Sequence, residues 1–430
     1  MSWKSKSLDM ERMITETMDL PTDLPQIRRF GTVLGVLVVS MSAVLLGVAP
    51  TATGADARDY QWYLDDMQAD EMWKVSTGKG IKVAVIDSGV RGTTPALRGQ
   101  VLPGADSTRH TRGDENDDRS GHGTSMAELI AGTGRGGAVQ GLAPGAKIIP
   151  VRFALKGAAS KRDAMDPKRL SRAVRAAADS DAQIISMSFG GLGYSPEGKS
   201  AIEYARSEGK LLFAATGNDG NDGAVNYPAA FPEVVGVGAI DREGVVEKYS
   251  NGGFHVDLVS PAGDLPTYCD KTLSRYCTGP GGTSSATALA SASAALIWSK
   301  HPDWTADQVL RVLIETAGRE AKSDVPSKYI GHGAVRPRIN LLEGKGSPGS
   351  ANDNPLTKKN EDLKASAKPS DKPSEGNSKG KDDEATERTE PAGATEKDDG
   401  GVNWPLAGVA AAIVVVIAGG AFAIVRTRRS

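Results

Sequence analysis

Cysteine is scarce in this chain, with two residues in 430, and neither sign of charge is in clear excess. The two cysteines, Cys269 and Cys277, exclude a cysteine-rich scaffold and any zinc site built on four thiolates. Lysine and arginine number 51 against 53 aspartates and glutamates, so the formal charge of −2 gives no case for nucleic-acid binding. At this length a folded domain needs neither disulfides nor metals as staples.

Large apolar residues are nearly absent from residues 344–403, where only Leu356, Leu363 and Val402 occur. A segment made mostly of Pro, Ser, Gly, Lys, Asp and Glu cannot bury enough apolar surface to offset the entropy lost on ordering it. We therefore expect residues 344–403 to be a disordered linker with a root-mean-square span of about 45 Å.

An uncharged apolar run, residues 30–48, lies near the N-terminus and follows Arg28 and Arg29. The small residues of Ala55-Asp56-Ala57 have the spacing of a signal-peptidase site, so we interpret residues 1–57 as an export signal. A run of 19 residues is long for a signal core. Cleavage after this signal and its retention as an anchor therefore both stay open.

A second uncharged apolar run, residues 406–425, has 20 residues and lies near the C-terminus. At about 1.5 Å per residue it spans about 30 Å, the thickness of the hydrocarbon core of a bilayer. We assign residues 404–426 to a transmembrane helix and residues 427–430 to a short tail. Arginines follow the run directly, so the positive-inside rule places the tail in the cytoplasm and residues 58–403 outside.

Residues 58–343 contain short apolar runs that alternate with helical patterns. The runs show little period-two alternation, as in strands that are covered on both faces. Strands that alternate with helices predict an α/β fold with a doubly wound, mostly parallel sheet and helices on both faces. The predicted strands are 81–87, 147–153, 182–189 and 210–216, and the predicted helices are 123–132, 167–180, 197–208, 284–300 and 305–317.

Four polar residues with catalytic chemistry stand at predicted strand or helix ends, each beside glycine. In a doubly wound sheet, functional groups collect at the carboxyl ends of the strands. Each residue alone is more often a cap or a turn residue, but the four together, in the order Asp, His, Asn, Ser, indicate a site. They are Asp87 in Asp-Ser-Gly, His122 in Gly-His-Gly-Thr, Asn218 in Ala-Thr-Gly-Asn and Ser284 in Gly-Thr-Ser-Ser-Ala.

These side chains supply the parts of a serine hydrolase. Ser284 needs a base to take its proton during attack, and His122 is suited to that role near neutral pH. Asp87 would accept the second ring N–H of His122, fix its tautomer and stabilise the imidazolium. Asn218 and the backbone N–H of Ser284 would donate hydrogen bonds to the developing oxyanion. An α/β-hydrolase is excluded because that fold orders its triad Ser–Asp–His around a G-x-S-x-G turn.

The order of these residues and their motifs resemble those of the subtilisin family of serine proteases. The separations are similar too, with 35 residues from Asp87 to His122, 96 to Asn218 and 66 to Ser284. The resemblance covers about 75–340 and implies a subtilisin-like fold and hydrolysis of peptide bonds. It also implies two substrate-binding segments, which are Ser188, Phe189 and Gly190, and Ala215, Thr216 and Gly217.

A narrower resemblance is to the mycosins, the membrane-anchored subtilisin-like proteases of type VII secretion. It rests on Gln61-Trp62-Tyr63-Leu64, Trp73 and Gly78-Lys79-Gly80, and on the layout of signal, protease, linker and C-terminal helix. The chain has fewer cysteines than mycosins commonly carry. Only 23 residues separate the expected cleavage site from the first strand, too few for a folding pro-domain. The segment Gln61–Trp73 is therefore expected to pack on the catalytic domain.

Two smaller features complete the prediction. Export favours a disulfide between Cys269 and Cys277 at the edge of the site, with two free buried thiols as the alternative. The acidic run Asp114–Asp118 lacks the glycine and the terminal glutamate spacing of an EF-hand loop, so it indicates a solvated loop. We therefore predict no metal site and no cofactor.

The sequence thus predicts a serine endopeptidase of the cell membrane, single-pass, with its catalytic domain outside and its C-terminus in the cytoplasm. Its partners would be a protein or peptide substrate, the membrane and, through the mycosin resemblance, a type VII secretion membrane complex. A second hypothesis is a structural scaffold of that complex in which proteolysis is dispensable. The intact triad favours the enzyme and leaves room for both roles.

Overall fold

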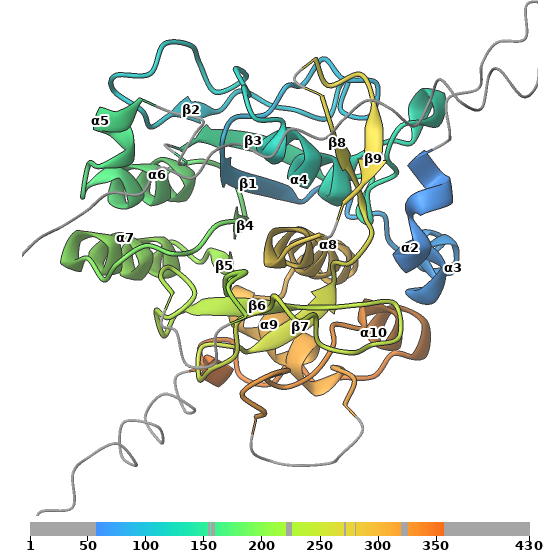
Figure 1. Cartoon of the computed structure of the whole chain (residues 1–430). Coiled ribbons are helices and arrows are strands. Elements are labelled where there is room, and N and C mark those ends of the chain that lie inside the picture. The colour runs from blue at the N-terminus through green and yellow to red at the C-terminus, as the bar shows by residue number, and fades with distance from the viewer. Residues whose placement is uncertain are drawn as a thin grey trace, which may run out of the picture. The chain divides into compact units, whose positions relative to one another are not determined.

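The computed structural model describes residues 57–153, 155, 160–220, 226–270, 272–279, 281–319 and 326–356 (Figure 1), which all belong to one compact unit. The expected signal up to residue 56, the linker beyond residue 356, the transmembrane segment 404–426 and the tail 427–430 lie outside these residues. Within the described ranges, no helix has both the length and the hydropathy needed to cross a bilayer.

Seven strands form one sheet in the order β2-β3-β1-β4-β5-β6-β7. Every pairing in this sheet is parallel, and the chain passes from one side of β1 to the other between β3 and β4. This is the doubly wound α/β arrangement that the sequence predicts. The strands are β1 (Lys82–Asp87), β2 (Ala105–Asp106), β3 (Lys147–Arg152), β4 (Ile184–Met187), β5 (Leu211–Ala215), β6 (Val234–Ile240) and β7 (Leu258–Pro261).

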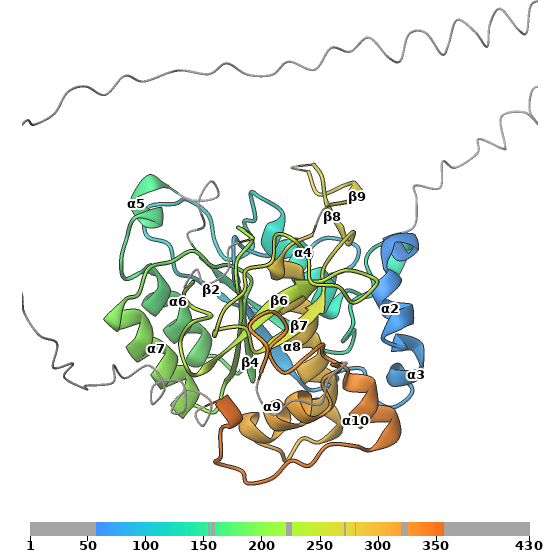
Figure 2. The ribbon, with the colours of Figure 1, turned by 60° about the horizontal axis from the view of Figure 1, so that its bottom comes forward.

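Helices cover both faces of the sheet (Figures 1 and 2). The apolar residues of α4 and α8 belong to the core on one face, and those of α6 and α7 to the core on the other. The α-helices are α2 (Trp62–Asp66), α3 (Ala69–Trp73), α4 (His122–Ala131), α5 (Lys161–Ala164), α6 (Arg169–Ala178), α7 (Pro196–Ser207), α8 (Thr283–Lys300), α9 (Ala306–Glu315) and α10 (Pro337–Glu343); the 3-10 helices are η1 (Ala57–Tyr60) and η2 (Arg135–Gly137).

All predicted strands and helices are present, within a few residues of the expected bounds. Helix α9 begins with the expected capping box, in which Thr305 accepts from the N–H of Gln308 and the side chain of Gln308 accepts from the N–H of Thr305. Strands β2, β6 and β7 are not among the predicted strands, and β2 has only two residues. Glycines interrupt the apolar run of β6, and β7 is four residues long and ends in proline.

The segment before β1 packs on the α/β domain, as expected. Gln61 is fully buried, and its side chain makes two hydrogen bonds to the backbone of Gln140. Its Oε1 accepts from the N–H of Gln140 at 2.9 Å, and its Nε2 donates to the C=O of Gln140 at 2.6 Å. The indole N–H groups of Trp62 and Trp73 donate to the carbonyls of Gly263 and Leu142, both at 2.9 Å. These four contacts join the extension to loops on two different parts of the domain.

The folded domain extends past Glu343, where the sequence places the start of the linker. Leu356 is 1% exposed and belongs to the main core. Thr305 donates to the carbonyl of Ala351 at 2.7 Å, and Arg311 pairs with Asp353 at 3.1 Å. The composition of residues 344–356 does not predict this packing, because one buried leucine and a few polar contacts to α9 are enough to hold the segment on the domain.

We expect Leu356→Ala to lower the free energy of unfolding by about 2–5 kcal/mol, since the change leaves a cavity in the core. In a domain of this size that loss lowers the Tm by roughly 4–10 °C. Leu342→Ala on α10 is the matched control, because Leu342 is 39% exposed and its loss should cost less than about 0.5 kcal/mol. If calorimetry gave equal Tm values for the two variants, residues beyond 343 would not belong to the folded domain.

Candidate active site

Asp87 and His122 form a hydrogen-bonded pair at the carboxyl edge of the sheet. Asp87 is the last residue of β1 and is fully buried, and His122 is the first residue of α4. The Nδ1 atom of His122 lies 2.7 Å from Oδ1 of Asp87. Because an ionised carboxylate only accepts, Nδ1 carries the proton, and Nε2 is left as the basic nitrogen.

A second carboxylate, Asp118, organises the turn that carries this pair. Asp118 is fully buried, although the sequence indicates a solvated loop. Its Oδ1 accepts from Ser88 Oγ at 2.8 Å and from the N–H of Gly121 at 2.9 Å, and its Oδ2 accepts from the N–H and hydroxyl of Thr124 at 2.9 and 2.6 Å. The available sequence signal was its place just before a helix start, where a carboxylate satisfies free N–H groups.

The electrostatics of this cluster act on the imidazole. Burial lowers the pKa of His122, but the charge of Asp87, its hydrogen bond and the charge of Asp118 raise it by more. The pKa therefore lies above the usual value of 6.5.

Ser284 lies in the first turn of α8, beside the residue that follows β4. Its hydroxyl donates to the carbonyl of Ser188 at 2.8 Å, and the hydroxyl of Ser188 donates to the carbonyl of Ser284 at 3.0 Å. Strand register pairs Ile86 of β1 with Met187 of β4. The next residues, Asp87 and Ser188, therefore leave the sheet side by side, one holding His122 and the other holding Ser284.

The amide of Asn218 is oriented by Thr283. Its Oδ1 accepts from both the N–H and the hydroxyl of Thr283, each at 2.9 Å. These two bonds identify the oxygen of the amide, so Nδ2 is the atom that points away from Thr283. A Cβ on Gly282 would lie 3.1 Å from this Nδ2. The amide N–H of Asn218 is thus directed beside the N-terminus of α8, where the backbone N–H of Ser284 also belongs to the unpaired first turn.

The two predicted substrate-binding segments lie next to each other. A Cβ on Gly190 would approach the carbonyl of Ala215 to 3.1 Å and the nitrogen of Gly217 to 3.8 Å. The side chain of Phe189 is 7% exposed and stacks on Phe153, with ring centroids 4.5 Å apart. Phe189 therefore offers its backbone to the site while its ring belongs to the core.

Thr216 and Gly217 shape the second segment. Thr216 is fully buried, and its carbonyl accepts from Asn226 Nδ2 at 2.9 Å. Gly217 has φ +111°, and a Cβ there would come within 2.4 Å of the amides of Asn226 and Asn251. Glycine is required at this position both by its backbone angle and by the space around it.

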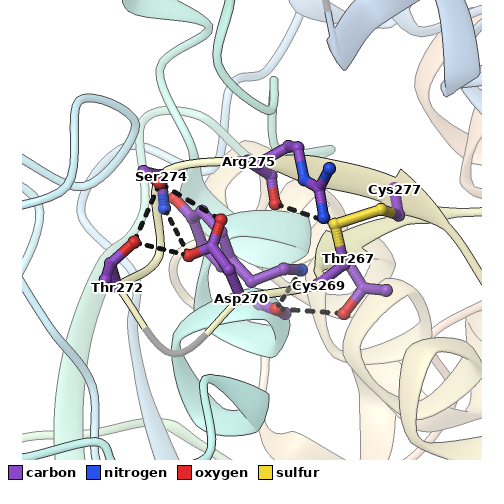
Figure 3. The surroundings of a disulfide bond; sticks show 9 residues. Thr267, Cys269, Asp270, Thr272, Ser274, Arg275 and Cys277 are labelled. Atoms are coloured by element: carbon purple, nitrogen blue, oxygen red, sulfur yellow. Dashed lines mark hydrogen bonds between the residues drawn. A yellow bond between two sulfur atoms is a disulfide. The ribbon is translucent and has the colours of Figure 1, made fainter.

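Cys269 and Cys277 form the expected disulfide (Figure 3), which closes the hairpin of β8 (Pro266–Tyr268) and β9 (Tyr276–Thr278). At the tip of this hairpin, Asp270 accepts hydrogen bonds from the hydroxyls of Thr272 and Ser274. The hairpin lies beside the start of α4, since a Cβ on the N-cap glycine of α4 would come within 2.6 Å of Leu273 Cδ2.

Comparison with known proteins places this geometry in a family. Residues 78–333 match the Subtilase family, a range that contains all four motif residues. The chain is 33% identical to the minor extracellular protease Epr of Bacillus subtilis over 277 residues, which are 62% of this chain and 41% of Epr. It is 34% identical to subtilisin E of B. subtilis over 245 residues, 56% of this chain and 61% of the relative. The chain thus spans less than two thirds of the length of either relative.

Solved structures with a similar fold include two mycosins. MycP1 from Mycobacterium smegmatis has a TM-score of 0.59 and 26% identity, over 71% of this chain and 89% of that one. The MycP3 protease from the type VII (ESX-3) secretion system has a TM-score of 0.56 and 30% identity, over 68% and 90%. The family match covers more than half of the chain and agrees with the sheet and the motif order. The chain belongs to the subtilase family of serine proteases, with mycosins among its structural neighbours.

Proposed function

We propose that the chain is an endopeptidase in which Asp87, His122 and Ser284 act as the triad and Asn218 stabilises the oxyanion. The observation that supports this most directly is the 2.7 Å bond from His122 to Asp87 on β1, one strand away from the residue that holds Ser284. The side-chain N–H of Asn218 is directed to the same helix start as Ser284. Each part of the chemistry is thus held by a different strand or helix end.

The reaction follows from these positions. A peptide lying along residues 188–190 and 215–217 places its carbonyl carbon above Ser284, whose hydroxyl turns from the carbonyl of Ser188 toward His122 Nε2. As Oγ attacks, its proton passes to Nε2, and Asp87 stabilises the imidazolium. The oxyanion accepts from Asn218 Nδ2 and from the N–H of Ser284. His122 then protonates the leaving amine, and water repeats the sequence on the acyl-enzyme.

We further propose that the enzyme works at the outer face of a cell membrane as part of a type VII secretion system. Support comes from the apolar run at 406–425 with its flanking arginines, the apolar run at 30–48, and the similarity to mycosin structures. One of these similar proteins, the serine protease MycP1, is an essential component of the type VII (ESX-1) secretion system. A scaffold role in the same complex is the alternative.

We expect Ser284→Ala and His122→Ala to abolish peptide hydrolysis and covalent labelling by a fluorophosphonate, since each removes the nucleophile or its base. Asn218→Ala should lower kcat by about 10²–10³, a magnitude known from subtilisin, while labelling persists more slowly. Ser207→Ala and His110→Ala, at exposed positions, are the matched controls and should keep full activity. Hydrolysis by purified Ser284→Ala at the wild-type rate would refute the assignment.

The pH dependence tests the base. His122 must be neutral to accept the proton, and its raised pKa means that the cation persists above pH 6.5. The rate of fluorophosphonate labelling should therefore fall with decreasing pH and be half-maximal at a pH above 6.5. Asp118→Asn should move this midpoint to lower pH because it removes a raising charge, whereas Asp114→Asn in the exposed part of the same loop should not. A wild-type midpoint below 6.5 would contradict the electrostatic argument.

Enzyme and scaffold are separated in the cell. We expect deletion of the protein to impair type VII secretion, while Ser284→Ala leaves most secretion intact and changes only the processing of particular exported proteins. The reason is that this substitution removes one hydroxyl and leaves the surface unchanged. If Ser284→Ala stopped secretion as completely as deletion at equal protein abundance, no scaffold role would be needed. If neither change affected secretion, the link to that system would be wrong.

A further inference from the structure

A buried carboxyl group, Glu128, joins the catalytic helix to the disulfide hairpin. Glu128 lies on α4, six residues after His122, and is fully buried. Its Oε1 lies 2.7 Å from the hydroxyl of Thr94 and 2.8 Å from that of Tyr268 on β8, and its Oε2 lies 2.7 Å from that of Tyr276 on β9. The two tyrosine hydroxyls are themselves 2.8 Å apart, and their rings stack.

The protons of this cluster can be counted. Four oxygen–oxygen contacts of 2.7–2.8 Å join Glu128, Thr94, Tyr268 and Tyr276. Each hydroxyl has one proton to donate, so the three hydroxyls fill three of the four contacts. With an ionised carboxylate, one contact would bring two oxygens to hydrogen-bond distance without a proton between them. A protonated carboxyl supplies the fourth proton, and the cluster is then complete.

We propose that Glu128 is a positioning residue that carries a proton in the active enzyme, and that this proton closes a hydrogen-bonded ring with Tyr268 and Tyr276 which fixes the β8–β9 hairpin on α4. The inference rests on the proposed catalytic roles of His122 and Ser284 for its effect on activity. The state of the ring itself does not depend on those roles.

The surroundings of the carboxyl favour the protonated form. Burial raises the pKa of Glu128 to about 7, although the hydrogen bonds from Thr94, Tyr276 and Tyr268 lower it. The titratable groups that face it are Tyr268 from β8 and Tyr276 from β9, and burial raises the pKa of both phenols. Thr94, from the segment after β1, does not titrate. Within the described part of the chain, this cluster therefore offers hydroxyls but no cation to stabilise a carboxylate.

The ring connects the two segments of the chain that carry the proposed catalytic residues His122 and Ser284. Helix α4 begins at His122, and β9 ends at Thr278, shortly before α8 begins at Thr283 with Ser284 next to it. The backbone N–H of Tyr268 also lies 3.4 Å from the hydroxyl of Ser125 on α4. Ionisation of Glu128 would leave one of the four contacts without a proton, so the ring would open and the hairpin would be held less firmly at the end that leads to Ser284. The closed ring thus sets the spacing between the start of α4 and the start of α8.

Two measurements on the full-length protein test the proton without using catalysis. The infrared band of a carboxylic acid should appear in the difference between the wild type and Glu128→Gln at pH 6 and vanish as the pH rises through about 7. Glutamine resembles the protonated acid in having an acceptor oxygen and a donor group, and it does not titrate, so it keeps the ring at every pH. Glu203→Gln on α7, at an exposed site, is the matched control and should show no such band.

The second measurement is unfolding by denaturant. Between the ordinary pKa of glutamate, about 4.5, and about 7, the folded wild type holds one proton more than the unfolded chain, so its stability falls as pH rises. The unfolding constant of the wild type relative to Glu128→Gln should therefore rise about tenfold per pH unit in this window and level off above it. Absence of the acid band, or a ratio independent of pH, would overturn the proposal.

Activity then tests the positioning role. The kcat of the wild type should decline above about pH 7 relative to that of Glu128→Gln, because ionisation opens the ring. Tyr276→Phe should lower kcat at all pH values, while Tyr204→Phe on α7, whose hydroxyl binds Asp179, should not. A flat ratio of kcat between the wild type and Glu128→Gln would overturn the positioning role. A wild type without any peptidase activity would instead contradict the proposed function, and the infrared and unfolding results would still decide the state of the ring.

Discussion

The parallel pairing of β1 with β4 is the constraint on which the site depends. Their register brings Ile86 opposite Met187, so the two chains leave the sheet as neighbours through Asp87 and Ser188. Asp87 holds the imidazole at the start of α4, and Ser188 exchanges two hydrogen bonds with Ser284 at the start of α8. A slip of either strand by one residue would turn the last residue of that strand to the opposite face of the sheet and would separate His122 from Ser284.

The sequence alone predicts the candidate residues whose signal is local. Asp87, His122, Asn218 and Ser284 stand in short glycine motifs, and the alternation of apolar runs with helical patterns predicts the parallel sheet. The contacts that orient them carry no such local signal, because the partners lie far apart in the chain. Thr283 holds the amide of Asn218 from a position 65 residues away in the chain, and that pairing exists only once β5 and α8 lie together.

The end of the domain shows the same limit. Residues 344–356 have the composition of a linker, and the entropy argument predicts disorder for such a segment taken alone. The segment is held instead by groups on α9, among them Thr305 and Arg311, and by the burial of Leu356. Composition measures how much apolar surface a segment can bury by itself, whereas residues 344–356 pack on a surface that α9 already provides.

The two buried carboxyl groups near the site show how the surrounding donors set the charge on a side chain. Asp118 accepts from the backbone N–H groups of Gly121 and Thr124 as well as from hydroxyls, and a backbone N–H can act only as a donor. Among the residues that the structure describes, Glu128 accepts from or donates to hydroxyls only, and two of those hydroxyls also contact each other. The first arrangement has enough donors for a carboxylate, so Asp118 adds negative charge that favours the imidazolium of His122. The second is one proton short, and the shortage is met by Glu128 itself. The same helix thus begins beside a charge that raises the pKa of His122 and continues to a buried acid whose proton, in the proposed ring, ties the helix to the hairpin.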